Sequence, residues 1–176
     1  MSNKVNKTWN NQGITNKRKG SNAERYYAQK FRSYGHDFCK TSREGSKLHD
    51  NAKIDLIFIP YNIQIKAGRQ KNMNPGKELL LLKSSIFEFF PPTHEVHNNP
   101  ILLIHYEEVG RGRRRLPEHE KVYMSLKQFE YFRTKSPLFA YDSMRELKLD
   151  ITSEFKIIVC MTFEHFEQQI ILKQIS

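Results

Sequence analysis

Apolar positions along the chain switch between helical and strand spacing. Residues 21–34 carry apolar side chains at helical spacing, begin at Ser21, a good N-cap, and end before Gly35, a good helix stop. Residues 53–59 are apolar almost throughout, with Asp55 among them, which is typical of a strand buried on both faces. Helices and strands are therefore expected to alternate, and the predicted fold class is α/β.

The other segments continue this alternation. We expect further strands over residues 36–41, 63–67, 101–106, 122–126 and 155–161, and helices over residues 78–90 and 126–133. The polar residues 42–47 are expected to form a loop, and residues 163–175 are amphipathic but ambiguous.

The strands on either side of residues 61–62 are close enough in sequence to pair as a hairpin with a two-residue turn. In that register Ile57 pairs with Lys66. Side chains two residues apart share one face of a strand, so Asp55 is expected on the same face as Gln64 and Lys66. A carboxylate, an amide and an ammonium group would thus gather on one face of an apolar hairpin.

This polar group has two interpretations, because buried polar side chains cost free energy unless they are paired. In the first, Asp55 and Lys66 form a diagonal ion pair and Gln64 lies exposed on an edge. In the second, carboxylate oxygens hold Mg²⁺ for phosphodiester hydrolysis, and the ammonium group orients the attacking water or offsets developing charge. The second interpretation needs another carboxylate. Glu24 is the candidate, although Ser21 and Glu24 also have the spacing of a capping box.

The sequence Arg-Lys-Gly-Ser-Asn-Ala-Glu-Arg at residues 18–25 closely resembles the opening motif of archaeal-type Holliday junction resolvases, members of the PD-(D/E)xK nuclease superfamily. In that family a metal-binding Glu of the first helix is followed by a Ser-containing loop, a strand Asp and a Glu-x-Lys strand. Glu24, residues 42–47, Asp55 and Gln64-Ile65-Lys66 follow the same order. The resemblance covers less than a third of the chain.

This resemblance implies a restriction-endonuclease-like fold, in which a mixed β-sheet is flanked by helices. It also implies a Mg²⁺-dependent endodeoxyribonuclease that cleaves four-way junctions or other branched DNA as a homodimer, with Mn²⁺ able to replace Mg²⁺. Glu24, Asp55 and Gln64 would bind the metal, and Lys66 would assist the attacking water. Gln64 departs from the family pattern, which has Glu or Asp there, so we expect an active site with weaker metal affinity.

Basic residues exceed acidic residues in this chain. Among 176 residues, 29 Lys and Arg against 19 Asp and Glu give a formal charge of +10, which favours nucleic acid as the partner. Residues 1–17 are expected to form a flexible basic arm, or alternatively a tail that keeps the protein soluble. Residues 18–110 are the expected nuclease core, and residues 111–176 an extension that completes the sheet or forms a dimer surface. The expected DNA contacts are Arg18, Lys19, Arg25, Ser42, Ser46, Arg69, Lys71, Arg113 and Arg114.

Other classes of protein are disfavoured. No apolar run approaches the ~18 residues of a membrane span, and Cys39 and Cys160 lack the spacing of a zinc site or a disulfide framework. We therefore expect an intracellular, cytoplasmic protein associated with the nucleoid. Two alternatives to a junction resolvase stay open: another PD-(D/E)xK nuclease of the nicking or restriction type, and a catalytically inactive DNA-binding protein of the same fold.

Overall fold

A mixed sheet organises the described part of the chain. The computed structural model describes residues 5–68, 73–107, 109, 114–135, 143–146 and 155–171. Within these residues the sheet has five strands, in the order β3 (Asn62–Ala67), β4 (Ile101–Tyr106), β5 (Glu120–Ser125), β7 (Ile157–Thr162) and β6 (Ser143–Glu146). β3 and β4 are parallel, and the other neighbours are antiparallel. The predicted α/β class is confirmed at this level.

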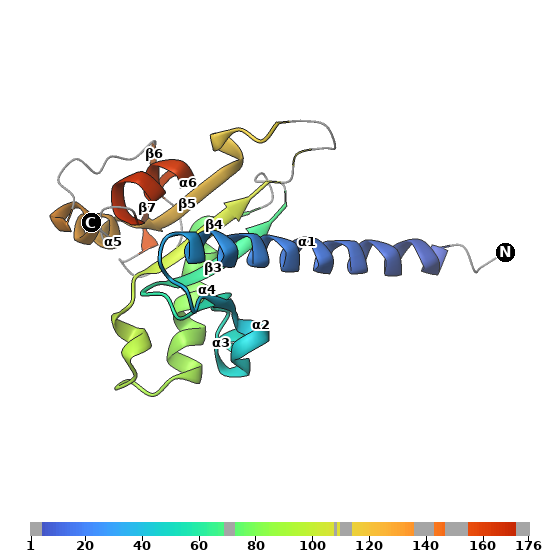
Figure 1. Ribbon diagram of the computed structural model, residues 1–176, viewed down its shortest axis with the longest axis horizontal. Coiled ribbons are helices and arrows are strands. Elements are labelled where there is room, and N and C mark those ends of the chain that lie inside the picture. The colour runs from blue at the N-terminus through green and yellow to red at the C-terminus, as the bar shows by residue number, and fades with distance from the viewer. Residues whose placement is uncertain are drawn as a thin grey trace.

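Helices cover both faces of the sheet (Figure 1). Those on one face are α1 (Val5–Ser33), α5 (Leu126–Lys135) and α6 (Phe163–Phe166), which continues as a π-helical turn, η5 (Glu167–Ile171). α4 (Pro75–Phe89) packs on the other face. The side chains from Ile101 to Ile104 of β4 enter the two cores alternately, and all side chains of β4 are buried. A strand covered on both faces needs a continuous apolar sequence, which is the pattern that predicted β4.

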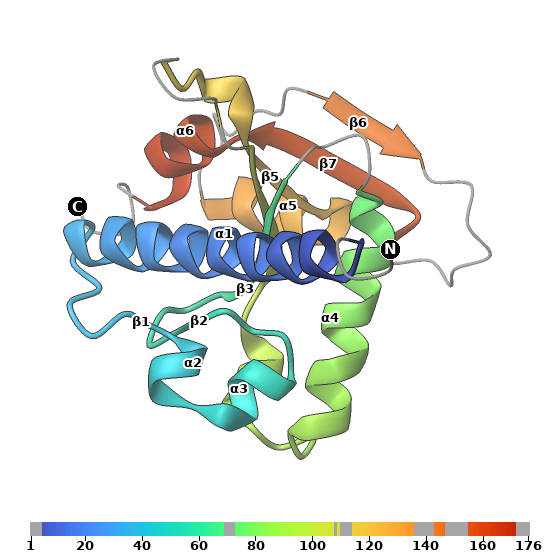
Figure 2. The ribbon, with the colours of Figure 1, turned by 90° about the vertical axis from the view of Figure 1, so that its right-hand side faces the viewer.

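A smaller unit lies beside α1 and the outer strand β3 (Figure 2). Its elements are β1 (Lys40–Thr41), α2 (Ser42–Gly45), α3 (Lys47–Asn51) and β2 (Leu56–Ile57). β1 and β2 pair antiparallel. The loop predicted over residues 42–47 is wrong, because two short helices form there and Ser46 caps the second by accepting from His49 N at 3.4 Å. Two 3₁₀ turns, η2 (Glu95–Asn98) and η3 (Pro117–His119), precede β4 and β5.

The first helix begins earlier than predicted. α1 runs from Val5 to Ser33, so Ser21 lies inside it and is not its N-cap. Residues 5–17, expected to belong to a flexible arm, are helical, and this end of α1 projects from the sheet in Figure 1. Gly13 and Gly20 lie within the helix, and each costs it only about 1 kcal/mol relative to Ala. A glycine before a good N-cap residue is therefore not enough to start a helix.

The predicted hairpin ladder is also wrong. β2 pairs with β1 and β3 pairs with β4, so Ile57 does not lie opposite Lys66. The chain leaves β2 at Phe58, whose φ of 64° lies in the left-handed region, and bends through residues 58–61 before β3. An extended strand cannot continue through such a residue. The apolar pattern of residues 53–59 therefore predicted a longer strand than the one that forms.

The remaining differences concern the ends of elements. α4 starts at Pro75 rather than at residue 78, because Asn74 caps it by accepting from Lys77 N at 3.1 Å. β5, β7 and β6 lie in the same sheet as β3 and β4, which is one of the two roles expected for residues 111–176. Within the described ranges, each helix is too short or too polar to cross a membrane.

Candidate functional site

Asp55 lies at the outer edge of the main sheet, beside β3. Its backbone N–H donates to Ile63 O at 2.8 Å, and Ile65 N–H donates to its Oδ2 at 2.6 Å. Its backbone O accepts from Ser42 N at 2.9 Å. Asp55 thus joins the smaller unit to β3 and holds its carboxylate against that strand. These contacts, rather than a hairpin ladder, bring Asp55 to the strand that carries Gln64.

Glu24 approaches the same region from α1. Its side chain is only 3% exposed, and its Oε1 lies 3.0 Å from Nη2 of Arg43 on α2. Its Oε2 has no hydrogen-bond partner. Burial raises the pKa of Glu24, and the charge of Arg43 opposes that rise. The capping-box interpretation of Glu24 is wrong, because Ser21 is in the interior of α1.

Asp55 ionises less readily than an ordinary aspartate. Burial raises the pKa of Asp55 from 3.8 to about 7, and the negative charge of Glu24 adds to the rise. The hydrogen bond from Ile65 N–H and the charges of Lys66 and Arg43 lower this pKa in part. Glu24, Lys66 and Arg43 are therefore all near enough to influence the ionisation of Asp55. A shifted carboxyl among such partners is typical of functional sites, although structural ion pairs produce shifts too.

Lys66 lies on β3, and its side chain reaches α4. Its Nζ is 3.0 Å from Oε2 of Glu78, in the first turn of that helix. Gln64, two residues earlier on β3, is only 5% exposed. The interpretation of a diagonal Asp55–Lys66 ion pair with an exposed Gln64 is therefore wrong. Lys66 instead pairs with Glu78, and its charge reaches Asp55 from there.

Three buried polar atoms in this region lack a hydrogen-bond partner. They are Glu24 Oε2, Ser42 Oγ and Gln64 Oε1, and in the part of the chain that the structure describes only one other buried side-chain atom, Arg115 Nε, shares this state. Unmatched buried polar atoms are rare, because each costs about 1–3 kcal/mol. Ser42 is bonded to Asp55 through its backbone, and Gln64 lies between the two residues that bond Asp55.

The donor set suits a hard cation. Mg²⁺ and Mn²⁺ prefer carboxylate and amide oxygens, and Glu24, Asp55 and Gln64 offer these. Among the described residues, no three His, Cys, Asp or Glu side chains are placed to share a metal. The third oxygen here belongs to an amide, so this set fits the cation but with less negative charge than three carboxylates would supply.

Two residues of this region were missed in the sequence. Arg43 contacts Glu24 and also lies 3.8 Å from Asp50 Oδ1, so one cation joins α1 to the smaller unit. Glu78 contacts Lys66. The sequence offered two weak signals. Arg43 stands beside Ser42 in a polar stretch, and Glu78 lies in the first turn of a helix, where an acidic side chain stabilises the helix itself.

The predicted DNA contacts lie in different environments. Ser42 is buried beside Asp55, whereas Ser46 caps α3. The exposed cations of the predicted set, in the described ranges, are Arg18, Arg25 and Arg114, and Lys19 is partly exposed. Three further predicted contacts, Arg69, Lys71 and Arg113, lie outside the described residues.

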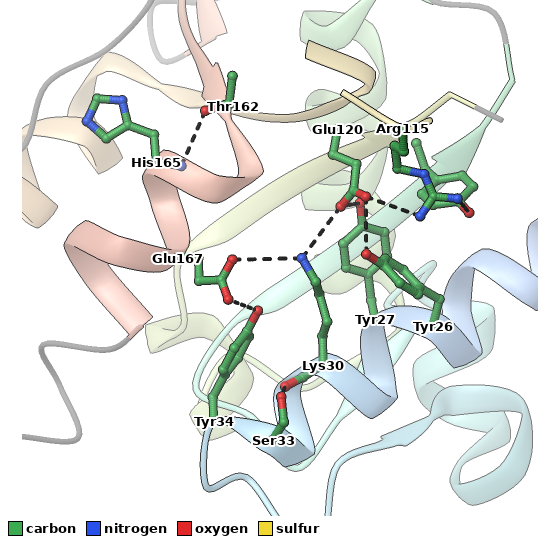
Figure 3. A network of polar contacts seen from close by, with 11 residues as sticks. Tyr26, Tyr27, Lys30, Ser33, Tyr34, Arg115, Glu120, Thr162, His165 and Glu167 are labelled. Carbon is green, nitrogen blue, oxygen red and sulfur yellow. Dashed lines mark hydrogen bonds and ion pairs between the residues drawn. The ribbon is translucent and has the colours of Figure 1, made fainter. Parts of the chain in front are cut away.

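A buried acid, Glu120 at the start of β5, fixes α1 on the sheet (Figure 3). Tyr26 OH donates to Glu120 Oε1 at 3.2 Å, and Tyr27 OH donates to Oε2 at 3.0 Å. Lys30 Nζ lies 3.8 Å and Arg115 Nη1 lies 3.4 Å from the same carboxylate. Four donors from two parts of the chain therefore share one acceptor group.

The same network reaches the C-terminal segment. Lys30 Nζ also lies 3.8 Å from Glu167 Oε2, and Tyr34 OH donates to Glu167 Oε1 (Figure 3). α1 is thus anchored both by β5 and by the turn after α6. Because Glu24 precedes Tyr27 by about one helical turn, these anchors also set the direction in which Glu24 points.

Replacing Glu120 should destabilise the fold. Glu120→Ala leaves the buried Tyr27 hydroxyl without its acceptor and removes one carboxylate partner from Lys30 and Arg115, so we expect the free energy of unfolding to fall by about 2–3 kcal/mol. Glu130→Ala is the matched control, because Glu130 is exposed and its contact with Arg133 is worth at most about 1 kcal/mol. Urea unfolding of both variants measures the difference. A loss no larger than that of the control would mean that the network does not anchor α1.

Comparisons of the chain with protein-family models, with curated proteins and with solved structures found no match. A function for this protein therefore has to be argued from its own residues.

Proposed function

We propose that this protein is a metal-dependent endodeoxyribonuclease that hydrolyses phosphodiester bonds in branched DNA, similar in mechanism and core fold to Holliday junction resolvases. The observation that carries the proposal is the gathering of Glu24, Ser42 and Gln64 around Asp55, each of the three with a buried polar atom that has no partner. The order of the motif at residues 18–25 and of these residues along the chain supports the same function.

Glu24, Asp55 and Gln64 would hold Mg²⁺, and Mn²⁺ would replace it. When bound, the ion supplies polarisation of a phosphoryl oxygen and a lower pKa for the attacking water. The unpartnered Glu24 Oε2 and Gln64 Oε1 are available as ligands without breaking any contact of the fold. Arg43, bonded to the other oxygen of Glu24, keeps that carboxylate in place.

Lys66 would act on the phosphate and the water. Its ammonium group is near enough to Asp55 to lower the pKa of that carboxyl, so it carries positive charge at the site. That charge offsets the negative charge that develops on the phosphoryl oxygens as the water attacks. Glu78, 3.0 Å away on α4, holds Lys66 in position.

The elevated pKa of Asp55 links metal binding to pH. With its pKa raised to about 7 by burial, Asp55 holds its proton to a higher pH than an ordinary aspartate does. A cation binds the ionised carboxylate, so its binding releases a proton. Metal affinity is therefore expected to rise with pH through this range.

The proposed substrate is branched DNA, and the proposed oligomeric state is a homodimer. The formal charge of +10 suits a polyanion. A four-way junction has two-fold related strands, and its resolution requires two cuts. Each chain holds one Glu24–Asp55 pair, so a dimer with two-fold symmetry would supply the two sites.

The test uses the purified protein with a labelled four-way junction and with a linear duplex of the same sequence, each in EDTA, Mg²⁺ or Mn²⁺. We expect metal-dependent cleavage of the junction in preference to the duplex. A monomer that cuts the duplex equally well would indicate a nicking or restriction-type nuclease. Tight DNA binding with no cleavage in either metal would indicate an inactive DNA-binding protein.

Gln64→Glu should strengthen metal binding. It places a third carboxylate at the site, and two opposite unit charges about 4 Å apart attract by about 1 kcal/mol even in water, with a larger attraction for a divalent ion. We expect the Mg²⁺ concentration for half-maximal cleavage to fall about fivefold or more. Gln29→Glu, which adds the same charge at an exposed position of α1, should leave it unchanged. A higher Mg²⁺ requirement in Gln64→Glu, with the fold intact, would show that Gln64 is not a ligand.

A further inference from the structure

Two phenylalanine side chains project into solvent at the end of the small sheet. Phe38 is 77% exposed and Phe58 is 63% exposed, and neither belongs to either hydrophobic core. Both line one hollow of about 410 Å³, together with Gly35, His36, Asp37 and Lys40. Exposed large apolar side chains that share one concave site indicate a binding surface.

The backbone at Phe58 is strained. Its φ of 64° is in the left-handed region, which bulky residues rarely adopt, and among the described residues only Lys53 shares this feature without being glycine. Asn or Gly would fit that conformation better. The strain is therefore not explained by the turn itself. Strained residues of this kind occur preferentially where a side chain is presented for function.

We propose that Phe38 and Phe58 bind an unstacked nucleobase next to the branch point of the DNA substrate. This inference rests on the proposed nuclease function and adds how branched DNA would be distinguished from duplex. In a continuous duplex each base is stacked and paired, whereas bases at a branch are released at lower cost. An aromatic ring that stacks on a released base contributes binding energy only with branched or single-stranded DNA.

The position of the hollow agrees with this role. Phe58 follows Asp55 by three residues, which corresponds to about 10 Å along an extended chain. Successive nucleotides of one strand are about 3.4 Å apart along the helix. The stacked base would therefore lie within about three nucleotides of the phosphate at Asp55.

The hollow also presents one exposed cation to a nucleic acid, balanced by one acid. Lys40 is exposed beside the rings and is available to a phosphate, while burial lowers the pKa of His36. Asp37 is the one acidic side chain of the lining. β1 and β2 pair here, Lys40 with Ile57, and Asp55 directly precedes β2, so the hollow and the candidate site lie on the same small sheet.

The test uses an immobile four-way junction with 2-aminopurine at a branch-point nucleotide, and a linear duplex with the same base paired, both in EDTA. The variants are Phe38→Ser and Phe58→Asn, the second chosen because Asn tolerates a positive φ. Phe87→Ser on α4 is the matched control, because Phe87 is 58% exposed and lies outside this hollow. Binding, fluorescence and sedimentation are measured for each protein.

We expect the wild type to change the fluorescence of the junction. Each of the two variants should remove that change and weaken junction binding about 10-fold, with duplex binding altered less than twofold and the control like wild type. Variants that bind the junction and change its fluorescence as the wild type does would overturn the inference. It would also be overturned if the variants changed the oligomeric state, because the surface would then join two copies of the chain.

The two proposals fail in different ways. A wild type that changes the fluorescence of the junction but cuts no DNA in Mg²⁺ or Mn²⁺ would contradict the nuclease and retain the base-binding surface. A wild type that cuts the junction with no fluorescence change at any branch-point nucleotide would contradict the base-binding surface alone.

Discussion

Asp55→Asn should reduce the cleavage rate of a four-way junction more than about 100-fold. The change removes the carboxylate that accepts from the β3 backbone, while an Asn oxygen can still accept from Ile65 N–H. Outer partners of metal ligands are themselves worth about 10- to 100-fold, so a ligand should be worth more. Single-turnover cleavage at saturating Mg²⁺ measures the effect on the chemical step.

Junction binding by this variant should stay within about threefold of wild type in EDTA. Affinity for DNA comes mainly from many Lys and Arg contacts with phosphates, and Asp55 makes none of these. Glu130→Gln, which neutralises an exposed carboxylate on α5, is the control for both assays. Cleavage by Asp55→Asn within about tenfold of wild type would remove Asp55 from the proposed mechanism.

Elements with one strong local signal were predicted well. The apolar run after Pro100 gives β4 with the expected bounds, because both faces of that strand are covered. The helix from Leu126 was also predicted, and Ser125 Oγ caps its first turn by accepting from Gln128 N at 3.3 Å. The start of α1 was not, because Ser21 is a good N-cap that here lies within a longer helix.

The hairpin shows a different limit of sequence patterns. The apolar residues after Asp55 gave no sign that Phe58 takes a positive φ, since that conformation is rare for Phe. The predicted register was therefore wrong, yet Asp55 still meets β3 through Ile63 and Ile65. A short connection keeps the two segments close whichever ladder forms, so the proximity of the residues was easier to predict than their pairing.

The partners of the site could not be predicted at all. Arg43 and Glu78 reach Glu24 and Lys66 from elements whose packing depends on the whole fold. The sequence order of a motif identifies residues of a given chemistry, but not the cations and acids that balance their charge. Such partners determine the ionisation of the site, and this has a measurable consequence for stability.

Without divalent metal, Asp55→Asn should stabilise the protein at pH 8 by up to about 4 kcal/mol, and the gain should vanish near pH 4. The pKa of Asp55 rises from 3.8 to about 7 on folding, chiefly through burial. Between these values the folded chain binds more protons than the unfolded chain, so the wild type loses stability as the pH rises through this window. Below about pH 4 the carboxyl is protonated in both states and contributes no difference.

The variant escapes this loss because Asn carries no charge at any of these pH values. Urea unfolding of both proteins in EDTA at about pH 4.5, 6 and 8 measures the difference, and it should grow with pH. Glu130→Gln serves as the control, since an exposed carboxylate has little effect on stability. Equal stability of wild type and Asp55→Asn at every pH would mean that burying the ionised Asp55 carboxylate does not destabilise the folded protein.

Adding Mg²⁺ at about pH 8 should narrow the difference between the two proteins and cancel it at about 1,000 times the dissociation constant, where binding contributes about 4.1 kcal/mol. A cation bound to the folded state stabilises it by about 2.7 kcal/mol at 100 times its dissociation constant, and more at higher concentration. Wild-type Asp55 offers an ionised ligand whose burial the cation compensates, whereas the Asp55→Asn variant offers only a neutral amide oxygen and should gain little. This readout needs no DNA and no cleavage. A wild type whose stability at this pH is indifferent to both Mg²⁺ and Mn²⁺ would contradict a metal site at Asp55, whatever the protein does to DNA.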